Sequence, residues 1–254
     1  MFLKNQTSAF FAEIKILMKN VPPLMFTFFV ISIIGMNLLA NKSLDTGLSW
    51  LALDCGFLLS WVAFLTMDIM TKRFGPKAAT QISVIALLIN LAFAGLMYAG
   101  SLVPGTWGEA YIAGHEAYIT AALDNTFGGT WYIILGSSVA FLSSAFLNNF
   151  LNWKIGCFFS KMPDSFKIFA ARAYISTFIA QFADNLIFAL IVSRTFFHWS
   201  MLQCITCAIT GATAELLCEV IFSPVGYNVS KKWQKEKVGQ DYIDFIAQTR
   251  SCGA

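Results

Sequence analysis

The chain has 254 residues, of which 57% are hydrophobic and 12% charged, with a formal net charge of +3 at pH 7. A typical soluble domain carries about twice that share of charge, and a disordered segment has few apolar residues, so both classes are excluded. The small net charge, carried by scattered basic clusters, also argues against a nucleic-acid-binding protein. The composition indicates an integral membrane protein.

The first 23 residues precede any apolar run long enough to cross a membrane. Lys15 and Lys19 interrupt this segment, and no small-residue cleavage site follows the first apolar run, so the pattern differs from that of a secretory signal peptide. We expect residues 5–19 to form a short helix on the inner membrane surface, and residues 230–250 to form a similar one.

Six apolar runs follow, each long enough to cross a hydrocarbon layer about 30 Å thick. Lipid offers the backbone no hydrogen-bond partners, so each run is predicted to be a helix. The runs are residues 24–40, 48–67, 79–102, 131–151, 168–192 and 201–223. The prediction is an all-α integral membrane protein with one membrane domain over 1–254: an inner-surface segment (1–23), a six-helix bundle (24–223) and a basic inner tail (224–254).

The basic residues predict the orientation of this bundle. With both termini on one side, that side carries 14 of the 17 Lys and Arg residues, and the other side carries only Lys42 and Arg194. Basic loops stay on the cytoplasmic side, so both termini are predicted to lie inside.

Residues 103–130, between the third and fourth runs, contain no Lys or Arg and many aromatic residues. Two interpretations remain open for this extended outer loop. It is an aromatic belt at the membrane interface, or a lid over an outward-facing cavity, hinged at Gly128 and Gly129.

Ionisable side chains inside membrane spans are costly and indicate function by default. Those in the predicted spans are Asp54, Arg172, Asp184, Glu215 and Glu219, and Asp68 lies at the inner end of the second span.

One face of the fifth span combines polar and aromatic groups. Gln181, Asp184, Asn185 and Phe188 follow the spacing i, i+3, i+4, i+7, which places them together on a helix. At about 1.5 Å per residue, Asp184 lies about 24 Å from the inner end of its span. Asp54 and Asn37 reach about 20 Å, so a shared layer is expected. This face predicts a recognition surface, and interhelical hydrogen bonding is the alternative for its amides.

A second polar layer is expected nearer the inner surface. Glu215 and Glu219 share a face of the sixth span. Arg172, four residues into the fifth span, either extends to the inner surface or pairs with one of these two carboxylates. The fourth span ends at this level in three amides, Asn148, Asn149 and Asn152.

Two stretches resemble a known family, the queuosine-precursor transporters, also called the vitamin-uptake transporter family. They are TMDIMTKRFGPKAA (66–79) and IAQFADNLIF (179–188). In the family, helix 2 ends in an Asp followed by a charged residue, an aromatic residue and Gly, and helix 5 carries Gln, Asp and Phe. The matching residues here are Asp68, Phe74 and Gly75, and Gln181, Asp184 and Phe188.

The resemblance implies six transmembrane helices with both ends inside, in the cytoplasmic (inner) membrane of a bacterial cell. It also implies import of a 7-deazaguanine base (7-cyano- or 7-aminomethyl-7-deazaguanine, or queuine) for tRNA modification. The last span differs from many members, which carry a Lys where this chain has Glu215 and Glu219. The chemistry fits such a base, since a carboxylate accepts the paired donors of a guanine-like edge, an amide donates to its carbonyl, and an aromatic ring stacks on it.

These observations assign two groups of candidate residues. The substrate-binding candidates are Asn37, Asp54, Gln181, Asp184, Asn185, Phe188 and Glu215, and the gating or coupling candidates are Asp68, Arg73, Arg172 and Glu219. No catalytic residue, metal or cofactor is expected, because the C-x-x-C at Cys204 and Cys207 has no second pair and nucleotide-binding and serine-hydrolase motifs are missing. The expected partners are a small-molecule substrate and the lipid bilayer, without nucleic acid, and a homodimer stays open.

The main alternative is a substrate-binding subunit of a modular, ATPase-driven vitamin importer. The first span offers few small residues for docking a coupling subunit, which disfavours this interpretation. An intramembrane aspartyl protease using Asp54 and Asp184 is disfavoured because its Tyr-Asp and Gly-x-Gly-Asp motifs are missing. A purely structural membrane protein is the third alternative.

Overall fold

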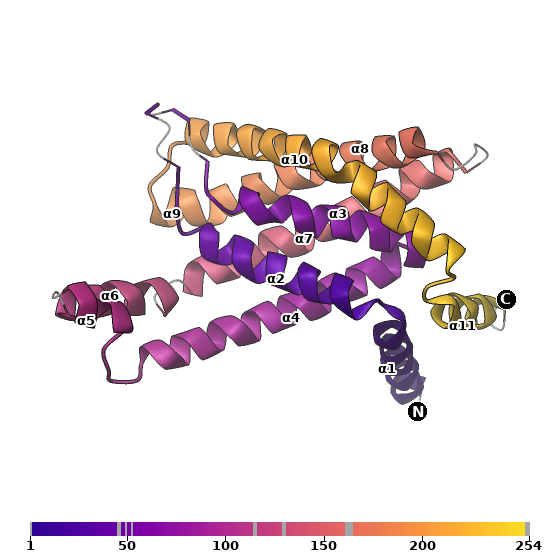
Figure 1. The fold of residues 1–254 in the computed structure, drawn as a ribbon, viewed down its shortest axis with the longest axis horizontal. Helices are drawn as coiled ribbons and strands as arrows, with labels where there is room; N and C mark the ends of the chain where they lie inside the picture. Colours follow the sequence, from indigo (N-terminus) through magenta and orange to yellow (C-terminus); the bar gives the residue numbers. More distant parts are fainter. Residues whose placement is uncertain are drawn as a thin grey trace.

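The structure, a computed structural model, describes residues 2–44, 47–48, 50–51, 53–113, 116–128, 131–160 and 165–251. Long helices lie side by side over most of this part of the chain, and its only β pairing is an isolated bridge between Ser43 and Asp54 (Figure 1). The bundle helices are α2 (Pro23–Leu39), α3 (Phe57–Phe74), α4 (Pro76–Ser101), α7 (Trp131–Phe158), α8 (Phe166–Phe188) and α10 (Met201–Lys235). The prediction of an all-α protein is confirmed.

Four helical stretches among the described residues are long and apolar enough to cross a membrane. A fifth is added if the bent pair of α1 (Phe2–Asn20) and α2, which meet at 104°, counts as one span. Helix α3 falls outside this group, since its 18 residues include Asp68, Lys72 and Arg73. The six-span count and the orientation therefore stay predictions.

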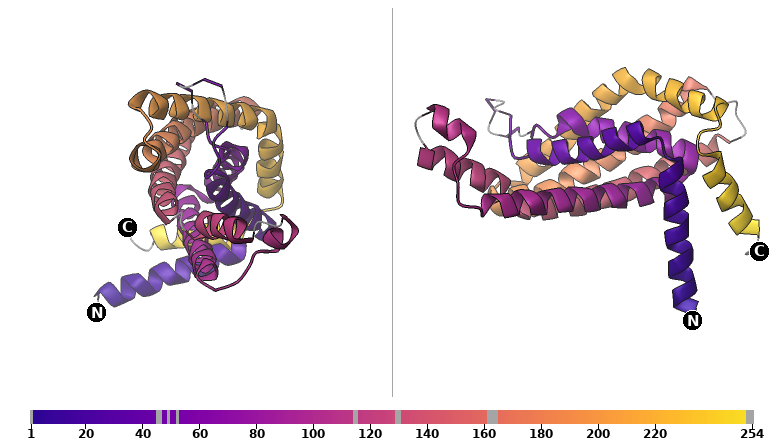
Figure 2. Two further views of the ribbon diagram at one scale, coloured as in Figure 1. Left: turned by 90° about the vertical axis from the view of Figure 1, so that its left-hand side faces the viewer. Right: turned by 60° about the horizontal axis from the view of Figure 1, so that its bottom comes forward.

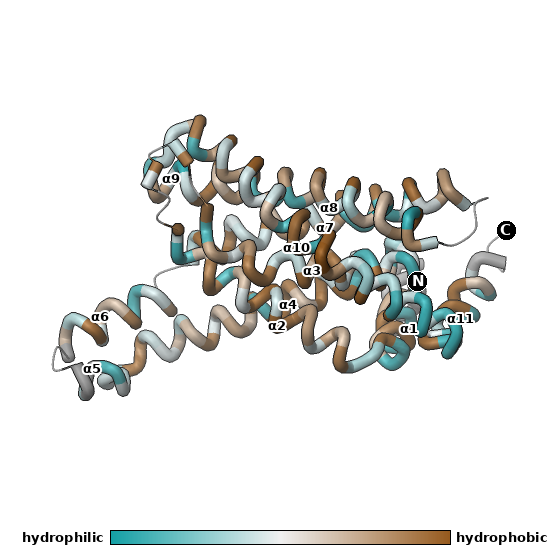
Figure 3. Tube along the Cα trace, turned by 45° about the horizontal axis from the view of Figure 1, so that its top comes forward, coloured by the Kyte–Doolittle hydropathy of each residue, from teal (hydrophilic) through white to brown (hydrophobic). Residues whose placement is uncertain are grey.

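The exterior of the bundle is apolar and its interior holds many polar groups. Leu96 is 72% exposed on α4, and Ile221 is 68% exposed on α10. Asp68, Gln181 and Glu219, in contrast, are fully buried. Hydrophilic residues concentrate in α1 and α11 (Gln240–Ser251), at the end of the molecule that holds the termini (Figure 3). This distribution suits a protein surrounded by lipid.

The predicted helix over residues 48–67 is wrong in its first half, because α3 begins only at Phe57. The backbone before it pairs with residues that follow α2: the Leu44 N–H donates to the Leu53 carbonyl and the Cys55 N–H to the Lys42 carbonyl, each at 2.8 Å. Asp54 was predicted to lie on a helix. It lies instead in a loop that folds back into the bundle.

Several helices also extend further than predicted, toward the end of the bundle that holds the termini. Helix α3 continues to Phe74, α7 to Phe158, and α10 to Lys235 with Pro224 inside it. At the opposite end of the bundle, helix α8 continues through the π-helical segment η1 (Ala189–Ser193) into α9 (Arg194–Phe196). The prediction that Asp68 and the three amides lie at the ends of their spans is consequently wrong, since all four are buried inside the bundle.

The two ends of the chain meet at one end of the bundle (Figures 1 and 2). Helix α1 and helix α11 (Gln240–Ser251) pack there against each other. Glu13 on α1 pairs with Lys77 at 2.6 Å and accepts from the buried Tyr242 hydroxyl at 3.4 Å.

A helix is present over the predicted residues 5–19. The predicted helix over 230–250 is divided between the end of α10, at Lys235, and α11. Contact of these helices with the membrane surface stays a prediction.

The connection between α4 and α7 contains α5 (Gly108–Ala113) and α6 (Glu116–Phe127) at the opposite end of the molecule (Figure 1). Trp107 donates from Nε1 to Asp124 Oδ1 at 2.9 Å, and α6 packs on α4. Of the predicted hinge, Gly128 directly follows α6, whereas Gly129 lies outside the described residues. The choice between lid and aromatic belt stays open.

Candidate functional site

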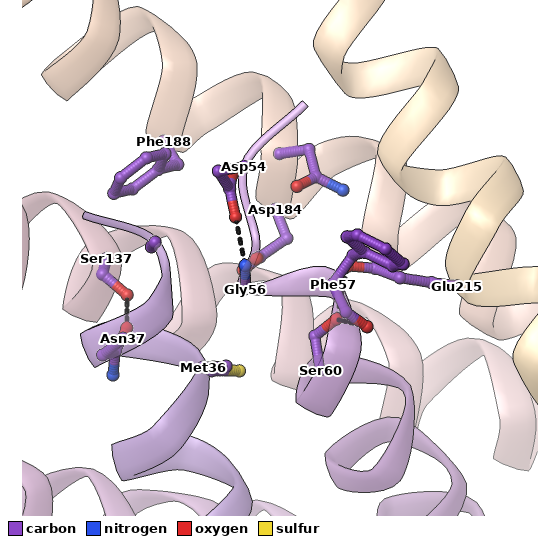
Figure 4. A pocket seen from close by; sticks show the side chains of 12 residues that line it. Met36, Asn37, Asp54, Gly56, Phe57, Ser60, Ser137, Asp184, Phe188 and Glu215 are labelled. Atoms are coloured by element: carbon purple, nitrogen blue, oxygen red, sulfur yellow. Dashed lines mark hydrogen bonds between the residues drawn. The ribbon is translucent and has the colours of Figure 1, made fainter. Parts of the chain in front are cut away.

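A cavity of about 360 Å³, counting its open mouth, lies among α2, α3, α7, α8 and α10. Its free interior is only about 30 Å³, which leaves room for about two waters. Its lining residues are Met36, Asn37, Ala40, Asp54, Gly56, Phe57, Ser60, Ser137, Asp184, Asn185, Phe188 and Glu215. Three carboxylates, from the loop before α3, from α8 and from α10, gather around this narrow space (Figure 4).

The loop before α3 holds Asp54 in place through its own backbone. Asp54 Oδ1 accepts from the Gly56 N–H at 2.7 Å, a local side-chain bond that competes with helix formation. Gly56 leaves room for this turn, because a Cβ there would lie 2.7 Å from Asp54 Oδ1. The carboxylate is thereby fixed at the cavity wall.

Helix α8 supplies the face predicted from its spacing, with one exception. Asp184, Asn185 and Phe188 line the cavity, and Asp184 Oδ1 accepts from Ser144 Oγ on α7 at 2.7 Å. Gln181 lies outside the lining and is fully buried, and neither of its amide atoms has a hydrogen-bond partner among the described residues. The structure therefore does not bring Gln181 to the cavity wall.

Glu215 and Asn185 lie beside each other where α10 meets α8. Ser60 on α3 donates to Glu215 Oε1. Within the described part of the chain, Glu215 Oε2 and Asn185 Nδ2 are buried without a hydrogen-bond partner. Gly211 permits this approach, since a Cβ there would lie 2.8 Å from Asn185 Nδ2. Such unpaired buried atoms are rare in proteins. The Asn185 amide acts on the Glu215 carboxylate as a hydrogen-bonding neighbour, so a ligand that uses this donor and this acceptor enters between the two side chains.

The remaining candidate of the outer layer, Asn37, also lines the cavity. Its Oδ1 accepts from Ser137 Oγ on α7. Asn37, Asp54 and Asp184, expected from their depths to share a layer, thus meet at one cavity.

A second polar cluster lies deeper in the bundle. Asp68 accepts from Asn148 Nδ2 at 2.8 Å and from Thr177 Oγ1 at 3.5 Å. Glu219 is an electrostatic neighbour of Asp68 and Thr177. Arg172 donates from Nη2 to Asn152 Oδ1 at 2.8 Å and acts on Asp68 through its charge. The gating or coupling candidates Asp68, Arg172 and Glu219 therefore belong to one cluster.

Arg73 lies apart from that cluster. Its Nε donates to the Val238 carbonyl at 2.7 Å and its Nη2 to Gln240 Oε1 at 3.3 Å. The side chain therefore joins the end of α3 to the segment that leads into α11.

The sequence reasoning missed three serines that hold the cavity's polar groups: Ser60, Ser137 and Ser144. Ser137 and Ser144 are seven residues apart on α7, so they share one face of that helix. That spacing was a usable signal, although serine is common in membrane spans as a small packing residue. No group of His, Cys, Asp or Glu among the described residues is suited to hold a metal ion.

An all-helical bundle with an apolar exterior and a carboxylate-lined cavity between its helices has the features that a membrane transporter requires. Residues 54–229 match the model of a family described as "putative vitamin uptake transporter", and the chain belongs to this family. The matched region begins at the cavity residue Asp54 and includes the deeper cluster. Searches of curated proteins and of solved structures found no match. The family and the fold point to a transporter of vitamin-like substrates and not to an enzyme.

Proposed function

We propose that this protein imports a 7-deazaguanine-type queuosine precursor, or a related purine-like base, by a secondary transport mechanism. The observation that carries the proposal is the set of polar groups at the cavity: the Asp184 carboxylate beside the unpaired Asn185 Nδ2 and Glu215 Oε2. These groups offer acceptors for two adjacent donors and one donor for a neighbouring carbonyl.

The edge of a guanine-like ring presents the complementary groups. Its ring N–H and its 2-amino group are adjacent donors, and one carboxylate can accept both in a bidentate pair. The carbonyl next to them accepts from an amide such as Asn185. Phe188 and Phe57, both in the lining, supply rings against which a flat base can stack.

The acidic lining also favours one member of the substrate class. Asp54, Asp184 and Glu215 line the same cavity, and three neighbouring buried carboxylates do not all stay ionised without a cation. An aminomethyl cation on the base is attracted to such a site. We therefore expect 7-aminomethyl-7-deazaguanine to bind at least as well as the 7-cyano base.

The narrow cavity is consistent with a transporter in an occluded state, closed to both sides of the membrane. With room for about two waters, it must widen before a base can enter. Alternating access achieves this when helices rock around a fixed site. The chain carries no nucleotide-binding motif, which favours a secondary mechanism over one driven by the chain's own ATP hydrolysis.

The test is restoration of queuosine in tRNA. Cells that neither make nor import the precursor receive this chain and one base at a time, and their tRNA is assayed for the modified nucleoside. We expect restoration with a 7-deazaguanine base at low external concentration. Failure with every 7-deazaguanine base, in cells whose membranes contain the protein, contradicts the substrate. Restoration that requires a co-expressed ATPase favours the modular importer instead.

A further inference from the structure

A series of buried carboxylates connects the cavity with the deeper cluster. Glu215 lines the cavity, and Glu219 follows one turn later on the same face of α10. Glu219 in turn neighbours Asp68 on α3, and it also interacts electrostatically with Glu215. Acidic groups therefore extend from the substrate cavity into the interior of the bundle.

The carboxylate of Glu219 lacks the partners that a buried charge needs. The residue is fully buried, and within the described ranges neither Oε1 nor Oε2 accepts a hydrogen bond of ordinary length. Its polar neighbours are the Thr177 hydroxyl and the Asp68 carboxylate, and neither of them is a cation. Asn148 Oδ1, in the same cluster, is also buried without a donor. The cluster thus contains several acceptors and too few donors, which is costly in an apolar interior.

The charges that face this carboxylate come from three helices. Asp68 faces it from α3, Glu215 lies on its own helix, and Arg172 of α8 acts on Asp68. Helix α7 contributes the amides of Asn148 and Asn152 to the cluster. The one guanidinium in this group balances one of the two adjacent carboxylates, Asp68 and Glu219.

Outside the cluster, Lys72 is the next basic residue on α3. Its Nζ lies 5.3 Å from the ring centroids of both Phe169 and Tyr227, further along the bundle toward the end that holds the termini.

Two adjacent buried carboxylates do not both stay ionised without a second cation. A proton on Glu219 removes the uncompensated charge and supplies the missing donor in one step. A sodium ion would balance the charge equally well, but it needs several oxygen ligands and space for itself. Asp68 and Glu219 lie in the packed interior, outside the cavity lining, so the proton is the cation that fits there.

We propose that Glu219 carries the proton that drives transport, with Asp68 as its partner and Glu215 as the link to the substrate cavity. This inference rests on the proposed import function. In the outward-open state a proton reaches the Glu219 carboxylate through the cavity. After the helices rearrange, the proton leaves to the cytoplasm and Glu219 is ionised again. One proton then moves inward with each substrate molecule.

The first test uses the purified protein in vesicles with the membrane potential clamped at zero. For one proton per neutral substrate, an inward gradient of one pH unit sustains up to about tenfold accumulation of the 7-cyano base. Glu219→Gln, which resembles the protonated side chain, should lose this pH-driven accumulation and should still exchange the base by counterflow. Glu236→Gln, an exposed position paired with Lys232 at 3.9 Å, should retain it.

The outcomes separate the coupling from the substrate. Counterflow of the base in the wild type, with accumulation driven by a sodium gradient and not by pH, overturns the proton while the import function stands. Accumulation by Glu219→Gln equal to that of the wild type overturns the role of Glu219. Lack of counterflow with any 7-deazaguanine base contradicts the import function.

A second measurement tests the proton without any substrate. Infrared spectra of the protein near neutral pH should contain the carbonyl band of a protonated carboxylic acid that disappears in Glu219→Gln and persists in Glu236→Gln. Identical carboxylic-acid bands in the wild type and Glu219→Gln show an ionised Glu219 and overturn the proposal, whichever substrate the protein carries.

Discussion

The substitution Asp184→Asn tests the recognition of the base most sharply. It preserves the size of the side chain but replaces one acceptor oxygen with an NH2 donor. Asp184 Oδ1 already accepts from Ser144 Oγ at 2.7 Å, and that hydroxyl also donates to the Phe141 carbonyl at 3.0 Å. The new amide can therefore turn either its oxygen or its NH2 toward Ser144. In both orientations the side chain has only one acceptor oxygen where the paired donors of the base need two.

The expected loss follows from that mismatch. Leaving a buried donor or acceptor unpaired costs about 1–3 kcal/mol, and more for a charged group. Since about 1.4 kcal/mol corresponds to a factor of ten in affinity, binding of a 7-deazaguanine base should weaken about tenfold or more. The variant should still insert, because removing a buried charge does not penalise an apolar bundle.

The assay is equilibrium binding of the 7-cyano and 7-aminomethyl bases to purified wild type and variant. Asp241→Asn, at an exposed position on α11, serves as the matched control and should bind as the wild type does. Hypoxanthine, which lacks the 2-amino group, should bind the wild type more weakly. Equal affinity of wild type and Asp184→Asn for the bases would refute the assignment, and equal affinity of the wild type for hypoxanthine would refute the paired donors.

Three further outcomes are expected. Single cysteines introduced into a cysteine-free background should react with an impermeant reagent from outside within residues 103–130 and only from inside within 72–78, and external labelling at position 75 would disprove the orientation. Asp68→Ala should lower transport and leave binding mostly intact, because this buried carboxylate lies outside the cavity lining; loss of binding in an inserted variant would place Asp68 in the site. Gly211→Leu should weaken binding measured on the purified protein, because a Cβ there lies 2.8 Å from Asn185 Nδ2, and unchanged affinity would remove Asn185 from recognition.

The sequence predicted the part of the site that depends on helix periodicity. Asp184, Asn185 and Phe188 lie on one face of α8 because their spacing matches 3.6 residues per turn, and all three line the cavity. Glu215 was found for a different reason: a carboxylate within an apolar run is costly, so it indicates a polar cavity or partner.

The parts that could not be predicted depend on tertiary contacts. An apolar run such as 48–53 reads as the start of a helix, although the backbone at Leu53 and Cys55 pairs with that of Leu44 and Lys42 instead. The burial of Asp68 was missed because charged residues suggest the end of a span, whereas α3 continues to Phe74 inside the bundle. Gln181 shares the spacing of the α8 face, but neighbouring helices cover it and keep it from the cavity.

The measurement that addresses the central claim most directly is uptake of a radiolabelled 7-deazaguanine base into vesicles containing only this protein. With unlabelled base trapped inside, we expect the labelled base to enter by counterflow. We expect external 7-aminomethyl base to compete with this uptake and hypoxanthine to compete little. Uptake no faster than in protein-free vesicles, or uptake competed equally by hypoxanthine, would contradict the proposed import of a base with paired donors.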